Sequence, residues 1–80
     1  MDDRQIIETI DRLVAEERQL RQQHASEPLG SDEAARLRSL EESLDQCWDL
    51  LRQRRARRQY GEDADEAAVR NPSVVEGYRQ

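Results

Sequence analysis

IIETIDRLVAEERQL at residues 6–20 and LRSLEESLDQCWDLL at residues 37–51 are the two stretches that decide the fold. In each, apolar side chains recur at alternating steps of three and four residues, the spacing of a coiled-coil seam. The seam positions are Ile6, Ile10, Leu13, Glu17 and Leu20 in the first stretch and Leu37, Leu40, Leu44, Cys47 and Leu51 in the second. When the second stretch is folded back on the first, the residue numbers of every facing pair add up to 57. The sequence therefore predicts an antiparallel helical hairpin. Glu17 is the only charged seam residue, and we interpret it as setting the register.

Capping signals mark the start of the first helix. Asp2 or Asp3 can cap this helix, and Asp2 is followed three residues later by Gln5, which is the pattern of a capping box. The apolar periodicity then continues to about His24. We therefore expect the first helix over about residues 3–24.

A bend and a second helix follow. Pro28 and Gly30 interrupt the periodic pattern and predict the bend between the helices. Ser31 or Asp32 is expected to cap the second helix, which we place over about residues 32–59.

The last twenty residues are acidic and lie beyond the hairpin. Gly61 suits a left-handed stop for the second helix. Asp63 followed by Glu66 is a further capping box, so we expect a short helix near residues 63–70 that ends before Pro72. An extended C-terminal tail completes the chain.

Composition limits what the chain can be. Its 80 residues are 39% charged, carry a net charge of -5 and include no Phe, which excludes a large core. No apolar run is long enough to span a bilayer, and the N-terminus lacks the order of a signal peptide. We expect a cytoplasmic protein with no membrane attachment. The single cysteine, Cys47, permits no internal disulfide and suits a reducing compartment.

An arginine run at the end of the second helix is the most concentrated charge. Its members, which would be the phosphate-binding residues if the run bound phosphate, are Arg52, Arg54, Arg55, Arg57 and Arg58. Alternatively, the run is a helix end whose cations pair with nearby acids, since the sum rule places Asp3 opposite Arg54 and Asp2 close to Arg55 and Arg57. The net negative charge and the lack of interleaved aromatics favour this second interpretation and argue against nucleic acid as a partner.

A second apolar stripe lies off the seam, where a lone hairpin would leave it in water. With the apolar residues of the tail, it predicts an interaction surface made of Ile7, Val14, Trp48, Val74, Val75 and Tyr78. The simplest partner is a second copy, so that two hairpins form a helical bundle as a homodimer. Docking of the tail alone and an unidentified protein client are the alternatives.

Catalytic chemistry finds little support in the chain. His24, the only histidine, is expected at the hairpin apex and far from Cys47, so neither can activate the other. A calcium loop begun at Asp63 would place Val74 where a bidentate Glu is required. We expect no enzyme activity, no metal site and no cofactor.

Three segments resemble a known family of short proteins. LVAEERQLR at residues 13–21, LDQCWDLLRQRRARR at residues 44–58 and VVEGY at residues 74–78 are similar to an actinobacterial family defined only as a domain of unknown function. The resemblance implies a small soluble intracellular protein, and it brings no activity, cofactor or catalytic residue.

The resulting prediction is an all-α protein. Residues 1–60 form a coiled-coil-like antiparallel hairpin, and residues 61–80 form an acidic short helix and a tail. The expected function is a non-enzymatic protein–protein interaction or regulatory module. The alternative is a nucleic-acid or nucleotide binder that uses the arginine run.

Overall fold

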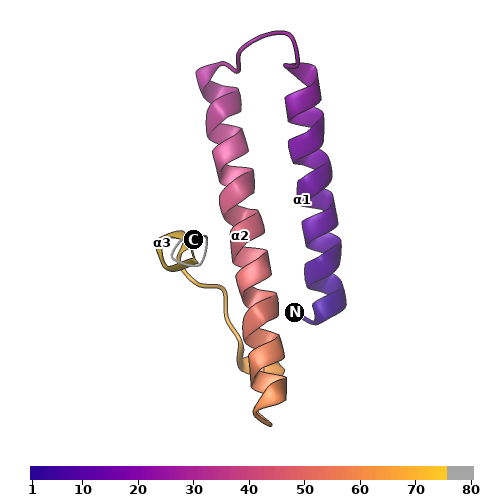
Figure 1. The fold of residues 1–80 in the computed structure, drawn as a ribbon, viewed down its shortest axis with the longest axis vertical. Helices are drawn as coiled ribbons and strands as arrows, with labels where there is room; N and C mark the ends of the chain where they lie inside the picture. Colours follow the sequence, from indigo (N-terminus) through magenta and orange to yellow (C-terminus); the bar gives the residue numbers. More distant parts are fainter. Residues whose placement is uncertain (76–80) are drawn as a thin grey trace.

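Two long helices make up most of the computed structural model, which describes residues 1–75. Its elements are α1 (Asp3–Gln23), α2 (Ser31–Gln59), the 3-10 turn η1 (Ala64–Glu66) and α3 (Pro72–Val75). Figure 1 shows α1 and α2 antiparallel and side by side, with α3 on the side of α2 that faces away from α1. The predicted all-α hairpin is confirmed, and both long helices have bounds within one residue of those expected.

The start of α1 has the predicted capping box. The backbone N–H of Gln5 donates to Asp2 Oδ1 at 2.8 Å, and the backbone N–H of Asp2 donates to Gln5 Oε1 at 2.9 Å. Two N–H groups that a helix leaves without intrahelical partners are thereby satisfied.

The start of α2 differs from the prediction. The cap is Gly30 and no side chain bonds to the free N–H groups, so the expected capping by Ser31 or Asp32 is wrong. The side chain of Glu33 folds back over the cap instead. Its Oε2 is so close to Gly30 that a Cβ at that position would lie only 2.7 Å from it. Glycine therefore leaves room for an acidic group that complements the positive end of the helix dipole.

The core lies along the seam between the two helices. Ile6, Ile10 and Leu50 form a buried cluster. The apolar groups packed against this cluster are Val14, Leu44, Cys47, Leu51 and Ala67. Leu40 is buried farther toward the bend. Ala67 comes from the segment after α2, so the C-terminal part of the chain completes a core that the hairpin begins.

Polar contacts between the helices confirm the predicted register at both ends. Asp3 Oδ1 lies 2.5 Å from Arg54 Nε, and Glu33 Oε1 lies 3.8 Å from His24 Nε2. Both pairs sum to 57. The flanking ion pairs are Arg21 with Glu41 at 3.2 Å and Arg36 with Glu16 at 2.6 Å. The residue numbers of these two pairs add up to 62 and 52, five above and five below 57. This is the pattern expected when the two ion pairs lie on opposite sides of the same seam.

The segment after α2 corrects another prediction. Gly61 adopts a φ of 73°, as expected for a left-handed stop, but the helix predicted near residues 63–70 is only the turn η1. Pro72 opens α3 and does not follow a helix, in keeping with the fit of proline to a first helical position. Residues 73–75 belong to α3, and the rest of the predicted tail lies outside the described residues.

Side chains of α2 explain why the predicted helix does not form. Carbonyl oxygens of the segment accept hydrogen bonds from α2, at Ala64 from Arg54 (3.2 Å) and at Ala68 from Gln53 (2.7 Å). The carbonyl of Arg70 likewise accepts from Gln46 at 3.1 Å. A helix over residues 63–70 would pair the Ala64 carbonyl with the N–H of Ala68. That N–H donates instead to Gln53 Oε1 at 3.5 Å, so the contacts with α2 hold the segment in an irregular path. Over residues 1–75, no helix is both long and apolar enough to cross a membrane.

The register predicts which engineered cysteines will pair. In a Cys47→Ala background, Leu13→Cys with Leu44→Cys should form an internal disulfide rapidly on mild oxidation, because these positions face each other in the seam. Leu13→Cys with Leu40→Cys, displaced by one turn, is the matched control. Equal rates for the two pairs, measured by thiol titration and mass spectrometry, would show that the register is not unique.

Candidate interaction surfaces

The arginine run contains a buried ion pair at its centre. Arg54 is 6% exposed, and its guanidinium donates to Asp3 Oδ1 at 2.5 Å, to Asp65 Oδ1 at 2.9 Å and to the carbonyl of Ala64. Arg54 therefore joins α2 to the start of α1 and to η1. The sequence pattern identified Asp3 as its partner, but the burial and the contacts with η1 were missed.

Other members of the run also pair with acids of the same chain. Arg58 donates to Asp3 Oδ2 at 2.7 Å. Arg57 lies 3.8 Å from Glu62 and 3.5 Å from Glu66. The predicted approach of Asp2 to Arg57 is thus replaced by pairing with the segment after α2. Arg52 and Arg55 lie on the exposed surface.

The charges of this cluster stabilise one another. Hydrogen bonds from Arg58 and Arg54 lower the pKa of Asp3 to about 2. The hydrogen bonds that Arg54 donates to Asp3 and Asp65 raise its pKa. A phosphate group at this cluster would have to displace carboxylates that are already bound. The geometry therefore fits a set of intramolecular ion pairs better than an anion-binding site.

A second buried charge, Asp49, was not identified from the sequence. It is 1% exposed, its Oδ2 accepts from Arg70 Nε at 3.0 Å and from Gln53 Nε2 at 2.9 Å, and its Oδ1 has no hydrogen-bond partner within residues 1–75. The only sequence signal is an acid between Trp48 and Leu50. Its partner Arg70 is distant in sequence, and nothing in helical periodicity points to it.

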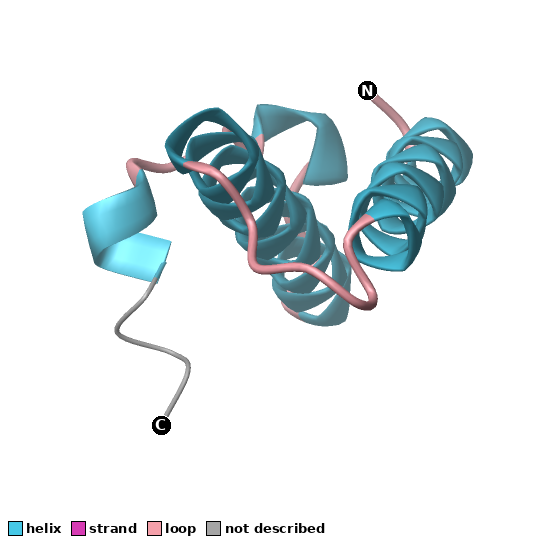
Figure 2. Ribbon diagram, turned by 90° about the horizontal axis from the view of Figure 1, so that it is seen from above, coloured by secondary structure: helices cyan, strands magenta, loops and turns pink. Residues whose placement is uncertain are grey.

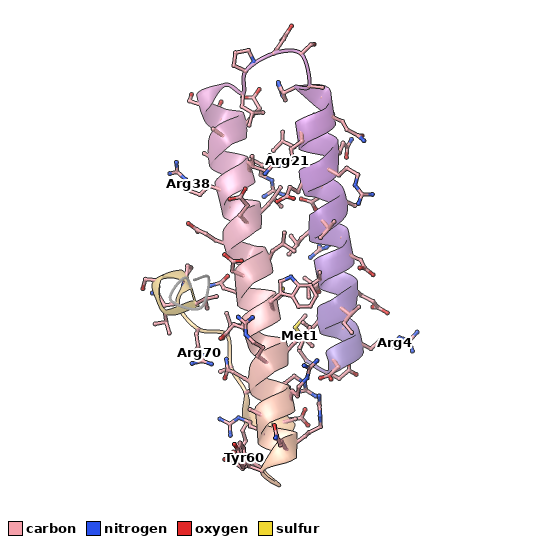
Figure 3. The ribbon with its side chains drawn as sticks, in the orientation of Figure 1. Met1, Arg4, Arg21, Arg38, Tyr60 and Arg70 are labelled. Carbon is pink, nitrogen blue, oxygen red and sulfur yellow. The ribbon has the colours of Figure 1, made fainter. Side chains whose placement is uncertain are left out.

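The C-terminal segment docks on this side of α2. Figure 3 shows Arg70 beside α2 on the side away from α1, and the view along the hairpin in Figure 2 places α3 outside the pair of long helices. Val75, at 1% exposed, is buried there. Val75 therefore belongs to the interior, whereas Val74 stays 49% exposed and Tyr78 lies outside the described residues.

The other three predicted surface residues share one flank of the hairpin. Arg21 points from α1 toward α2 in Figure 3, and its ion pair with Glu41 shows which positions face each other on this flank. The same sum of 62 places Val14 opposite Trp48, one heptad away. Trp48 is 50% exposed and Ile7 is 48% exposed. We call Ile7, Val14 and Trp48 the apolar flank. Val14 is half-buried against the core cluster, and docking of the described C-terminal segment leaves Ile7 and Trp48 open to solvent.

Cys47 and His24 lie in different parts of the hairpin. Burial raises the pKa of the Cys47 thiol, which disfavours the reactive thiolate. His24 is paired with Glu33 near the bend, and Glu33 and Cys47 are fourteen residues apart on α2, or about 21 Å. The two side chains cannot act together as nucleophile and base.

The lowered pKa of Asp3 predicts an acid-dependent loss of stability. A depressed carboxyl pKa stabilises the folded state above the unfolded value near 3.8, and this stabilisation is lost as the pH falls toward 2. Asp3→Asn should therefore lower the free energy of unfolding at pH 7 by about 1 kcal/mol, allowing for solvent screening. Thermal unfolding from pH 7 to pH 2 should show the difference from the parent shrinking toward pH 2. A difference independent of pH would contradict this origin.

Removing the partner of Asp49 should release the C-terminal segment. Arg70→Ala leaves a buried carboxyl group bonded to Gln53 alone, which we expect to cost about 1–3 kcal/mol. Hydrogen exchange should show loss of protection from η1 onward while α1 keeps its protection. Arg38→Ala, at an exposed arginine that points away from α2 in Figure 3, is the control and should change neither.

Comparison with known proteins gives a family and no activity. The family model described as "Protein of unknown function (DUF2630)" matches residues 2–80. The chain is also 57% identical over 67 residues to the uncharacterized proteins Rv0898c of Mycobacterium tuberculosis H37Rv and Mb0922c of Mycobacterium bovis, covering 82% of this chain and 77% of each relative. No solved structure matches it. Because the family match extends over the hairpin and the C-terminal segment, the chain belongs to the DUF2630 family.

Proposed function

We propose that this protein is a non-enzymatic interaction module that binds another protein through the apolar flank. The observation that carries the proposal is the exposure of Trp48 and Ile7, each about half accessible, on one flank of the hairpin beside the buried cluster of Ile6, Ile10 and Leu50. A tryptophan has a large apolar surface and is enriched at the energetic centres of protein interfaces.

The position of the C-terminal segment supports this choice of surface. The segment is held on another side of α2 by Gln46, Asp49 and Gln53, so the described part of the chain docks without covering Trp48. Ionic groups border the flank, with Arg21 and Glu41 at one end. An apolar centre with a polar rim is the usual arrangement of a protein interface.

A nucleic-acid function has weaker support. Arg54, Arg57 and Arg58 are engaged by carboxylates of the same chain, and the whole chain is negatively charged. Binding to phosphates would give up these ion pairs, whereas binding through the apolar flank would give up none of them. The proposal also includes a cytoplasmic site of action, because a single unpaired cysteine suits a reducing compartment.

Photo-crosslinking in the cells of the source organism tests the proposal. Ile7 is replaced by a benzophenone-bearing residue, and the matched control carries the same group at Gln19, which is exposed and lies roughly 140° around the helix from Val14. We expect protein adducts from position 7 and none from position 19. Equal adducts from both positions, or none from either, would contradict the proposal.

The arginine run provides a separate prediction. Fluorescence anisotropy at physiological salt should detect no tight binding of duplex DNA or single-stranded RNA, and Arg55→Gln should leave the result unchanged. Arg54 is kept because its loss would disturb the fold. Tight binding by the parent that Arg55→Gln weakens and added salt abolishes would establish the nucleic-acid function instead.

A further inference from the structure

We propose that the apolar flank binds a second copy of the same chain. The two copies are related by a two-fold axis that lies in the interface between them, perpendicular to the helices and at the level of Val14 and Trp48. This inference rests on the proposed function and names its partner. The axis stacks α1 on α1 and α2 on α2 in antiparallel pairs, so that the two hairpins form a four-helix bundle.

On α1, two opposite charges beside Val14 are placed to pair across this axis. Asp11 precedes Val14 by three residues and Arg18 follows it by four, so the two are seven residues apart and lie on one side of the helix. Both are exposed, and neither makes an ion pair within residues 1–75. A two-fold axis at Val14 brings Asp11 of each copy to Arg18 of the other. The symmetry forms this pair twice, at equal distances from the axis.

The charges beside Trp48 repeat the pattern on α2. Glu41 and Arg55 lie seven residues before and seven residues after Trp48, and both are on its side of the helix. The same axis therefore places Arg55 of one copy at Glu41 of the other. Glu41 already accepts from Arg21, and a carboxylate has acceptor sites for a second guanidinium.

The apolar centre fits the same axis. Val14 and Trp48 are nearest to it, so each packs against its own counterpart, and the two indoles become covered together. Ile7, one heptad from Val14, meets the aliphatic stem of Arg21 in the other copy. The C-terminal segment leaves the approach open, because Asp49, which anchors it, lies roughly 100° around α2 from Trp48.

A second copy could also pack with the axis parallel to the helices, which stacks α1 on α2. In that arrangement Arg55 would face Ile7, an apolar side chain, and Asp11 would meet the region of Arg52 in place of Arg18. Both axes cover Val14 and Trp48 and place Ile7 against an arginine stem, but only the perpendicular axis sets a carboxylate, that of Glu41, directly opposite Arg55. The charge pattern therefore favours the perpendicular axis.

Sedimentation equilibrium on the full chain tests the dimer. At concentrations up to about 200 µM we expect a mass approaching twice 9.4 kDa for the parent and 9.4 kDa for Trp48→Glu. Circular dichroism should show that the variant keeps its helix content. A parent mass of 9.4 kDa throughout, or a dimer that Trp48→Glu leaves intact, would overturn the proposal.

Charge swapping tests the position of the axis without touching the apolar centre. Asp11→Arg and Arg18→Asp should each weaken the dimer about tenfold, because each creates two like-charge contacts across the axis. The double variant should return to within about threefold of the parent, since it exchanges the charges of the same pairs. A double variant weaker than either single variant would indicate the parallel axis and overturn the proposal.

Separate outcomes of these experiments contradict the dimer and the interaction module. A monomer that still gives adducts from position 7 in cells shows that the flank binds a different protein, so that the interaction module stands and the dimer does not. A monomer that gives no adducts removes both.

Discussion

The hydrogen bonds that the buried guanidinium of Arg54 donates connect all parts of the described structure. The guanidinium bonds Asp3 at the start of α1, Asp65 in η1 and the carbonyl of Ala64, so one side chain connects the first helix, the second helix and the segment beyond it. A guanidinium suits this position because its planar fork offers several donors in different directions and keeps its charge at any physiological pH. The end of the hairpin is thereby closed, and the C-terminal segment starts its return along α2 from a fixed point.

That return path determines which surface remains available. Gln46, Asp49 and Gln53 lie along one side of α2 and bind the backbone or side chains of residues 68–70. Because the segment occupies that side, its last described residue, Val75, is buried there, and the apolar flank stays open. The same contacts that complete a small fold therefore separate the structural charges from the apolar residues that we assign to binding.

Helical periodicity was sufficient to predict the hairpin, its register and even the pairing of Asp3 with Arg54, since each follows from positions along two regular helices. It could not predict that Arg54 is buried, because the burial depends on η1, an irregular segment. The helix expected near residues 63–70 is wrong for a related reason: the Ala64 carbonyl and the Ala68 N–H, which would pair in that helix, are bound by Arg54 and Gln53 of α2. Of the residues predicted for an interaction surface, Ile7 and Trp48 are about half exposed, whereas Val14 packs against the core cluster and Val75 is interior.

We infer that the ion pairs of the arginine run stabilise the fold, and we assign binding to the apolar flank. Residue-resolved hydrogen exchange of Arg54→Lys tests this inference most directly, because lysine keeps the charge but lacks the planar fork that reaches Asp3 and Asp65 at once. Arg55→Lys, the neighbouring exposed position, is the control. We expect Arg54→Lys to weaken the protection of the first turns of α1 and of the segment after α2 together, and Arg55→Lys to change neither. Unchanged protection in Arg54→Lys, or the same loss in both variants, would contradict it.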